Sequence, residues 1–164
     1  LTLTAAASYA DWANTRLLGP LLPFGNTVDA DGNLVNDYDL LEGYVELGTA
    51  LGSLPLSLFA QYGVNTDPDD EDTAYGLGAL LGKTGAPGTW QVGYAYHHHE
   101  KDALLAQVVD SNFGGGATGA RGHVLTGGYS LAPNVTVNLS YFVNEVYDLE
   151  LVEVERDYKR VMLD

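Results

Sequence analysis

Hydrophobic and polar residues alternate along most of the chain, a period typical of β-strands whose two faces meet different surroundings. The clearest case is residues 135–144, where apolar side chains occupy every second position. Comparable alternation predicts further strands over 1–12, 39–51, 56–64, 74–82, 90–97, 122–131 and 157–164. In the best-defined strands, Phe59, Leu80 and Phe142 break the rule. The sequence therefore predicts an all-β chain with eight strands of roughly 8–14 residues.

The joins between these strands are alternately short and long. The short joins lie around 52–53, 83–88 and 132–134, and they contain Gly, Pro or Asn, which suit tight turns. The long joins are 13–36, 66–73, 100–121 and 145–156. In an antiparallel up-and-down barrel this order places every long join at one end. Outer-membrane barrels are built this way, with short periplasmic turns and longer extracellular loops.

The composition fits a barrel wall set in lipid better than a sheet that faces water. The 164 residues include 7 Lys and Arg against 22 Asp and Glu, a formal charge of −15, and most of the acidic residues fall in the long joins. The polar strand faces carry Gly, Ala, Ser, Thr, Asn and Gln rather than Lys and Glu. Aromatic residues gather towards strand ends, as in interfacial girdles, at Tyr62, Tyr75, Trp90, Tyr96 and Tyr129. We therefore expect a transmembrane β-barrel in the outer membrane of a Gram-negative bacterium, in contact with lipid and lipopolysaccharide.

Composition also excludes several classes of protein. The negative charge leaves no basic surface for a nucleic acid. Without Cys there are no disulfides, thiolate metal sites or cysteine nucleophiles, and no run of about 18 apolar residues predicts a transmembrane helix. The length suits one domain over residues 1–164. Because the chain starts at Leu1 without a signal-peptide pattern, we expect a processed or partial product, incomplete at one or both ends.

Several segments of the chain are similar to one known family. They are 37–43, 55–65 and 88–96, then Glu100-Lys101-Asp102-Ala103, 110–116 and 121–123. Over most of residues 38–144, and again at 160–164, the chain resembles the bacterial putative porins of the outer membrane. The resemblance implies a β-barrel that passes small solutes and has no catalytic residues. Family members are longer, which implies that the eight strands are the C-terminal part of a larger barrel. Outer-membrane barrels also tend to end in an aromatic residue, whereas this chain ends at Asp164.

The expected function is that of a porin, with passive diffusion of small hydrophilic solutes or ions through a mildly acidic, water-filled lumen. Neither catalysis nor a cofactor is expected. Glu42 and Glu46 share a strand face, and ionised carboxylates are costly in lipid, so they should face the lumen. There they would favour cations or pair with an inward Arg or Lys. The predicted pore-lining residues are Glu42, Tyr44, Glu46, Ser57, Gln61, Gln91, Thr136, Asn138, Ser140 and Asn144.

Other architectures and assemblies fit the same pattern. One rival is a closed eight-stranded structural or adhesive barrel whose interior is filled by side chains. Another is a soluble ligand-binding barrel, which has the same alternation. A homo-oligomer is compatible with each of the membrane-bound alternatives.

The join over residues 101–120 is the candidate for a loop that narrows the pore. Helix-forming residues occupy its first half, and Leu104, Leu105 and Val108 form an apolar stripe that could pack on the barrel wall. Folded inward, this join would set Asp102 and Asp110 against Lys101 and Arg121 across the lumen. The alternative is an external cap or a contact with a neighbouring subunit.

Other residues suggest chemistry that simpler explanations cover. His97 and His99 share a strand face and, with His123, are metal-ligand candidates, although a polar rim at the outer end of the strand is the preferred explanation. Residues 29–33 resemble the start of a calcium loop, but the position that needs Glu holds Leu40. Loose calcium binding there or at 67–72 competes with a solvated acidic loop. Ser111, His123 and Asp110 lack the setting of a hydrolase triad, and 114–119 lacks the Lys-Ser/Thr ending of a phosphate loop.

Overall fold

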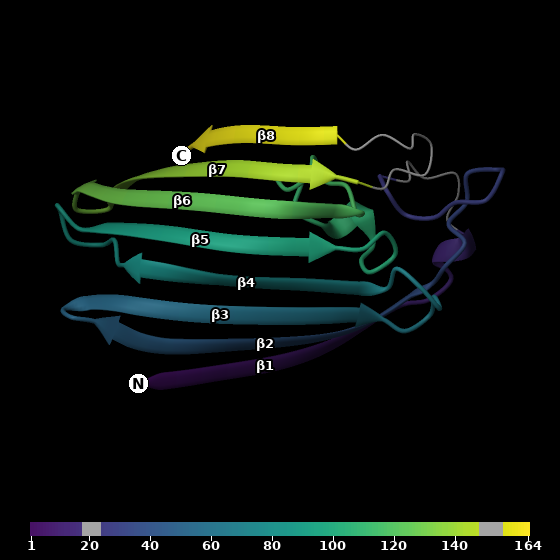
Figure 1. Ribbon diagram of the computed structural model, residues 1–164, viewed down its shortest axis with the longest axis horizontal. Coiled ribbons are helices and arrows are strands. Elements are labelled where there is room, and N and C mark those ends of the chain that lie inside the picture. The colour runs from purple at the N-terminus through teal and green to yellow at the C-terminus, as the bar shows by residue number, and fades with distance from the viewer. Residues whose placement is uncertain (18–23, 148–155) are drawn as a thin grey trace.

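The computed structural model describes residues 1–17, 24–147 and 156–164, and its strands form one antiparallel sheet (Figure 1). The strands are β1 (Thr2–Trp12), β2 (Tyr38–Leu51), β3 (Leu54–Asn65), β4 (Thr73–Gly82), β5 (Trp90–His99), β6 (Ala120–Ala132), β7 (Val135–Val146) and β8 (Arg156–Leu163). Two short 3-10 turns, η1 (Thr15–Leu17) and η2 (Ala106–Val108), lie in the long joins. The prediction of eight strands is confirmed.

Neighbouring strands in the sheet are neighbours in the sequence, in the order β1 to β8. Every adjacent pair is antiparallel, which confirms the up-and-down arrangement. Between the described parts of β1 and β8 there is no pairing, so the sheet is open.

The short turns gather at one end of the sheet and the long joins at the other (Figure 1). Gly52 and Asn134 occupy the left-handed backbone region in the first and last short turns, with φ of 63° and 62°. Such angles let two antiparallel strands reverse within a few residues. Most of the join between β7 and β8 lies outside the described residues. The short-turn end also holds the start of β1 and the end of β8 (Figure 1).

The two faces of the sheet differ in chemistry because residues paired across antiparallel strands point to the same side. We call one the apolar face; its central row is Leu3, Leu47, Leu58, Ala79, Tyr94, Leu125, Tyr141 and Val161. We call the other the polar face; it carries Glu42, Glu46, Gln61, His97 and Asn144. The large side chains of the apolar row are mostly exposed, from 37% for Tyr141 to 70% for Leu3.

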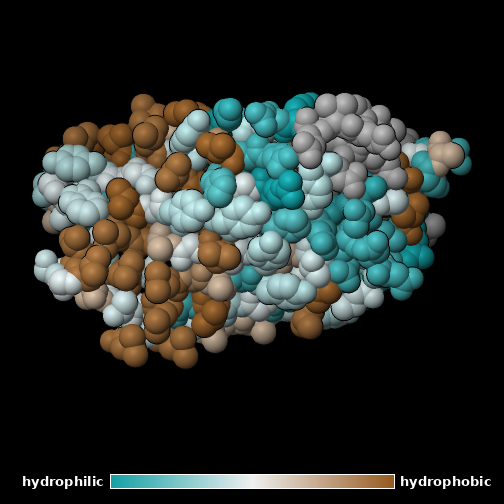
Figure 2. Space-filling view, viewed as in Figure 1, coloured by the Kyte–Doolittle hydropathy of each residue, from teal (hydrophilic) through white to brown (hydrophobic). Residues whose placement is uncertain are grey.

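The space-filling view shows where these side chains gather. Hydrophobic residues cover the half of the molecule that contains the short turns, and hydrophilic residues cover the half that contains the long joins (Figure 2). Among the described residues, no helix is long and apolar enough to cross a membrane.

The residues that break the alternation lie on the polar face and have specific neighbours there. Phe59 lies opposite Gly78, where an added Cβ would come within 2.5 Å of the Phe59 ring. Leu80 lies over Gly93 in the same way. Phe142 is buried, in a cluster with residues of the join between β5 and β6. Glycines on adjacent strands therefore make the room that Phe59 and Leu80 need.

Most of the buried apolar residues in the described part of the chain fall into two clusters at the end with the long joins. One contains Phe113, Ala117, Ala120, Phe142 and Val146. The other contains Leu34, Tyr38, Leu40 and Leu105. In both clusters a long join packs on strand ends, so the joins are held against the sheet.

Candidate pore-lining face and its loop cover

All the predicted pore-lining residues lie on the polar face. Tyr44 pairs with Gln61, and Gly48, on the same side of β2 as Glu46, pairs with Ser57. Gln91 lies on the same side of β5 as His97, and on β7 the residues are Thr136, Asn138, Ser140 and Asn144. One continuous surface thus carries hydroxyl, amide and carboxylate groups from four strands. Its role as a pore lining stays a prediction.

The carboxylates of β2 are held by hydroxyl groups. Glu46 accepts hydrogen bonds from Tyr44 Oη and Ser57 Oγ, both at 2.6 Å. Glu42 accepts one from Ser8 Oγ at 2.8 Å. Within the described part of the chain neither forms an ion pair with Lys or Arg. In that part of the chain, hydroxyl donors rather than cations therefore bind both carboxylates.

Two cavities lie along the polar face over β1 to β5. One of about 260 Å³, towards the long joins, is lined among others by Ser8, Glu42, Gln61, His99 and Leu104. The other, of about 700 Å³, lies nearer the short turns and is lined by Thr2, Glu46, Ser57, Leu80 and Gln91, with several neighbours. The acidic side of the polar face is hollow, with room for small solutes.

At the end with the long joins, the polar face over β5 to β7 is covered by the join between β5 and β6, residues 100–119, which we call the loop cover. The Phe113 ring packs on His97 and His99, with ring centroids 5.5 and 5.1 Å apart. Gly114 N donates to Asn144 Oδ1 at 3.2 Å. The loop cover therefore contacts predicted pore-lining residues, and it lies on the same side of the sheet as Glu42 and Glu46.

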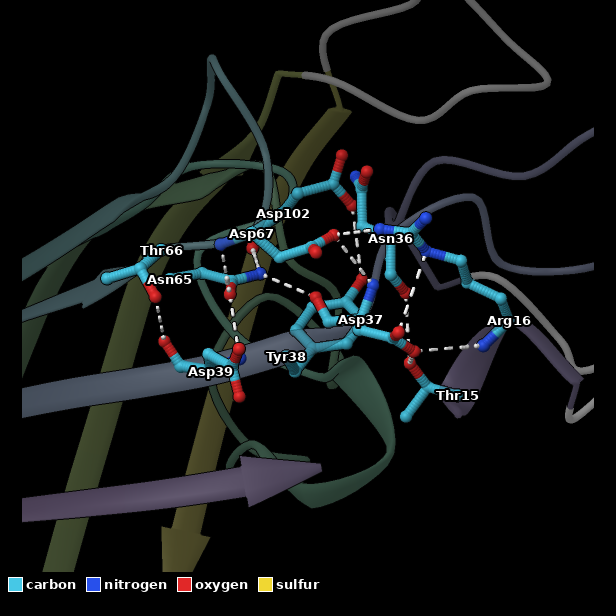
Figure 3. Close-up of polar contacts among 10 residues, drawn as sticks. All are labelled: Thr15, Arg16, Asn36, Asp37, Tyr38, Asp39, Asn65, Thr66, Asp67 and Asp102. Carbon is cyan, nitrogen blue, oxygen red and sulfur yellow. Dashed lines mark hydrogen bonds and ion pairs between the residues drawn. The ribbon is translucent and has the colours of Figure 1, made fainter. Parts of the chain in front are cut away.

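A set of buried polar groups, which we call the polar anchor, ties several long joins to the ends of β2 and β3 (Figure 3). The Asp102 carboxylate is 3% exposed and accepts hydrogen bonds from Tyr38 Oη at 3.1 Å and from the N–H and hydroxyl of Thr27. Asn65 Nδ2 donates to the main-chain oxygen of Asp102 at 2.9 Å. Asp102 thus fixes the start of the loop cover.

An ion-pair network continues the polar anchor at the surface. Arg16 pairs with Asp67 and lies 3.8 Å from the Asp37 carboxylate. Partial burial opposes ionisation of Asp37, but hydrogen bonds from the Thr15 hydroxyl and the Arg16 N–H, together with the Arg16 charge, outweigh it and lower the pKa of Asp37. The joins after β1 and β3 are therefore linked by charge as well as by hydrogen bonds.

Asn26 determines the path of the loop cover, and the sequence reasoning missed it. Its buried amide donates to the carbonyls of Lys101 and Leu104 at 2.9 and 2.8 Å and accepts from Ala106 N. A helix would use those carbonyls for its own N–H groups. The expected helix is accordingly reduced to the 3-10 turn η2. In the predicted stripe Leu105 is buried, whereas Val108 is 56% exposed.

The residues proposed to narrow the pore do not form one cluster. Asp102 is buried in the polar anchor, and Asp110 is exposed and accepts from Asn112 N. Lys101 is half-buried at the start of the loop cover. Arg121 pairs across the strands with His98, on the apolar face, and binds Glu145 at 2.9 Å. Its charge therefore does not face Asp102 across the polar face.

The metal-ligand candidates are divided between the two faces. His97 and His99 lie on the polar face, with ring centroids 6.1 Å apart, whereas His123 lies on the apolar face with its Nδ1 2.8 Å from Tyr94 Oη. No group of three ligating side chains occurs among the described residues. The Asp29 carboxylate accepts N–H groups from Asn33 and Asp31, which lower its pKa. Calcium binding there or at 67–72 stays a prediction.

The C-terminal strand adds two basic residues to the polar face. Tyr158 and Met162 pack against the cluster that contains Phe113, so alternate residues of β8 face the same side. Arg156 and Arg160 are therefore on the polar face, paired with Val146 and Phe142. The alternation from 157 to 164 could have revealed Arg160, whereas Arg156 lay outside the predicted strand.

These features define an all-β protein whose single up-and-down antiparallel sheet has one exposed apolar face and one polar face. The model of the putative porin family matches residues 37–154, and the chain belongs to that family. Membership indicates, in general terms, a porin-like and non-enzymatic role at the outer membrane. No curated protein and no solved structure matches the chain.

Proposed function

We propose that the chain forms the wall of an outer-membrane β-barrel channel through which small hydrophilic solutes or ions diffuse passively, with a preference for cations. The apolar face would contact lipid, and the polar face would line the lumen. The long joins would lie outside the cell and the short turns in the periplasm. Loop cover residues on the polar face would narrow the passage.

One observation carries this proposal: an apolar row crosses all eight strands, and six of its eight residues are exposed. Contiguous apolar patches on soluble monomers rarely exceed a few hundred Å², and a row that crosses a whole sheet would be unstable in water. In a bilayer the same row contacts lipid tails instead of water, so its exposure has no hydrophobic cost. The aromatic residues Tyr62 and Tyr75 at one end and Trp90 and Tyr129 at the other fit interfacial girdles.

Two features favour a channel over the rival architectures. A closed structural barrel fills its interior with side chains, whereas the polar face here keeps cavities of about 260 and 700 Å³. A soluble ligand-binding barrel would hide its apolar face, which here is the exposed one. The proposed cation preference rests on the excess of Asp and Glu over Lys and Arg, 22 against 7, with most of the acidic residues in the long joins.

The proposal is tested by reconstituting the intact protein in planar bilayers. We expect it to require detergent for extraction, to give stepwise single-channel currents, and to show a cation-selective reversal potential that grows at low salt. A folded, membrane-inserted protein without current would favour the closed structural barrel. Extraction without detergent would favour the soluble one, and an anion-selective reversal potential would contradict the cation preference.

Orientation has a separate test. A tag inserted beside Asp69, in a long join, should be labelled on intact cells, whereas a tag at Gly85, in a short turn, should be labelled only after the outer membrane is opened. The reverse result would contradict the proposed orientation.

A further inference from the structure

The polar face carries an acidic strip on β2 and a basic strip on β8 at the same two levels. Following paired residues from strand to strand leads from Glu46 to Arg160 and from Glu42 to Arg156. The intervening residues are Phe59, Gly78, Ala95, Val124 and Phe142 on the first row, and Gly63, Ala74, His99, Ala120 and Val146 on the second. These rows carry no Asp, Glu, Lys or Arg between the two strips.

Each strip places a tyrosine between its two charges. Tyr44 lies between the carboxylates and donates to Glu46 at 2.6 Å. Tyr158 lies between the guanidinium groups, and Arg160 Nη1 is 3.5 Å from its hydroxyl. Within the described residues, neither strip is neutralised by an ion pair. Arg156, Arg160 and Glu42 are also exposed, so a solute can reach them.

Measured along the sheet, the strips are farther apart than the Debye length at physiological salt. Six strand-to-strand steps separate β2 from β8, and at about 4.8 Å a step the path along the sheet is roughly 29 Å. The Debye length is about 8 Å at 0.15 M salt and about 30 Å at 0.01 M. At physiological salt the strips therefore act on ions independently, whereas at low salt their fields overlap.

We infer that the wall provides two separate ion tracks: a cation track along Glu42 and Glu46, and an anion track along Arg156 and Arg160 that takes small carboxylate or phosphate solutes. This inference rests on the proposed channel function. The inference goes beyond the proposed function because the two strips carry equal and opposite charges, two carboxylates against two guanidinium groups. The net cation preference then comes from the acidic long joins, and small anions still have a path through the wall.

The test measures reversal potentials of the intact protein in a KCl gradient. At about 0.15 M salt, E42Q/E46Q should shift the potential towards anions and R156Q/R160Q towards cations. The shift of the quadruple variant should equal the sum of the two, and this additivity should fail near 0.01 M salt, where the fields overlap. Acetate or phosphate as the anion should show the same dependence on Arg156 and Arg160.

Lys159→Gln is the matched control, because Lys159 lies between the two arginines and on the apolar face, opposite Val143. It should leave the reversal potential unchanged. An unchanged potential in R156Q/R160Q, or a shift as large in Lys159→Gln, would overturn the anion track while leaving the channel intact. Non-additive shifts at 0.15 M would overturn the independence of the tracks. A wild-type protein without current would instead overturn the proposed function, and the two tracks with it.

Discussion

The two halves of the polar face differ in what fills them and in how the long joins are attached. Over β1 to β4 the face is hollow, and the nearby joins are held by the polar anchor around Asp102. Over β5 to β7 the face is covered at the end with the long joins, and the part of the loop cover around Phe113 is held by an apolar cluster. A single sheet thus has cavities on one part of its polar face and close packing on another. The cavities lie where carboxylates and hydroxyls line the face, and the buried side chains lie where apolar groups meet.

Removing the loop cover should give the largest effect on conduction. Deletion of residues 104–116 takes away Phe113 and the segment that lies over His97 and His99. We expect a clear rise in single-channel conductance, because the covered half would then resemble the open half. Phe113→Ala, which keeps the chain length, should give a smaller rise. Unchanged conductance in a correctly folded deletion would show that the cover lies outside the conduction path.

Alanine substitutions at the two phenylalanines that break the alternation show how much each half contributes to the free energy of unfolding. Phe142 is 6% exposed in the covered half, so Phe142→Ala should lower the free energy of unfolding by about 3–5 kcal/mol. Phe59 is only half-buried in the open half, and Phe59→Ala should cost clearly less. Urea unfolding in lipid vesicles measures both. Equal losses would mean that the open half is packed as tightly as the covered one.

Breaking the polar anchor should have a smaller effect. Asp102→Ala leaves the Thr27 N–H and the Tyr38 hydroxyl without their acceptor, at a cost of about 1–3 kcal/mol for a buried unsatisfied group. We expect faster proteolysis of the loop cover in this variant. Asp110→Ala, at an exposed position of the same loop, is the control and should change stability by no more than about 0.5 kcal/mol. Equal stability and equal proteolysis of the two variants would contradict the role of Asp102 in the polar anchor.

Acid should weaken the ion-pair network that continues the polar anchor. The pKa of Asp37 is lowered in the folded protein, so its stabilising effect is complete above the ordinary aspartate pKa of about 3.9 and is lost as pH falls through the folded value. Thr15→Val removes one donor to Asp37 and should move this loss to higher pH. Protease sensitivity of residues 13–37 between pH 5 and 2 would follow it. A pH profile identical to wild type would contradict the assignment.

The strands could be predicted because alternation is local: each side chain's face follows from its place in its own strand. The same rule placed Glu42, Gln61 and Asn144 on one side without knowledge of their partners. Arg121 was assigned differently because β6 begins at Ala120, earlier than predicted, and strand geometry then directs Arg121 to the apolar face. A shift of a residue or two at a strand end is enough to change which groups face each other.

The loop cover could not be predicted because its shape depends on distant residues. Local helix preference in 103–108 is outweighed by Asn26, which takes the carbonyls that a helix would need. That contact joins positions 78 residues apart in sequence. The burial of Asp102 has the same origin, since its partners Thr27 and Tyr38 come from another join and another strand. Sequence periodicity carries no record of such pairings.

The alternating pattern also determines how hydrophobic the chain is before it folds. Polar and small residues recur throughout the strands, so the mean hydropathy is −0.04 and no segment has the 18 or so continuous apolar residues that insert as a helix. In the unfolded chain, therefore, no stretch is hydrophobic enough to be retained in a bilayer as a helix. The apolar surface comes into existence only when the strands pair and sort their side chains to two sides. Strand pairing is thus the step in which a chain without any long hydrophobic segment acquires a continuous apolar face.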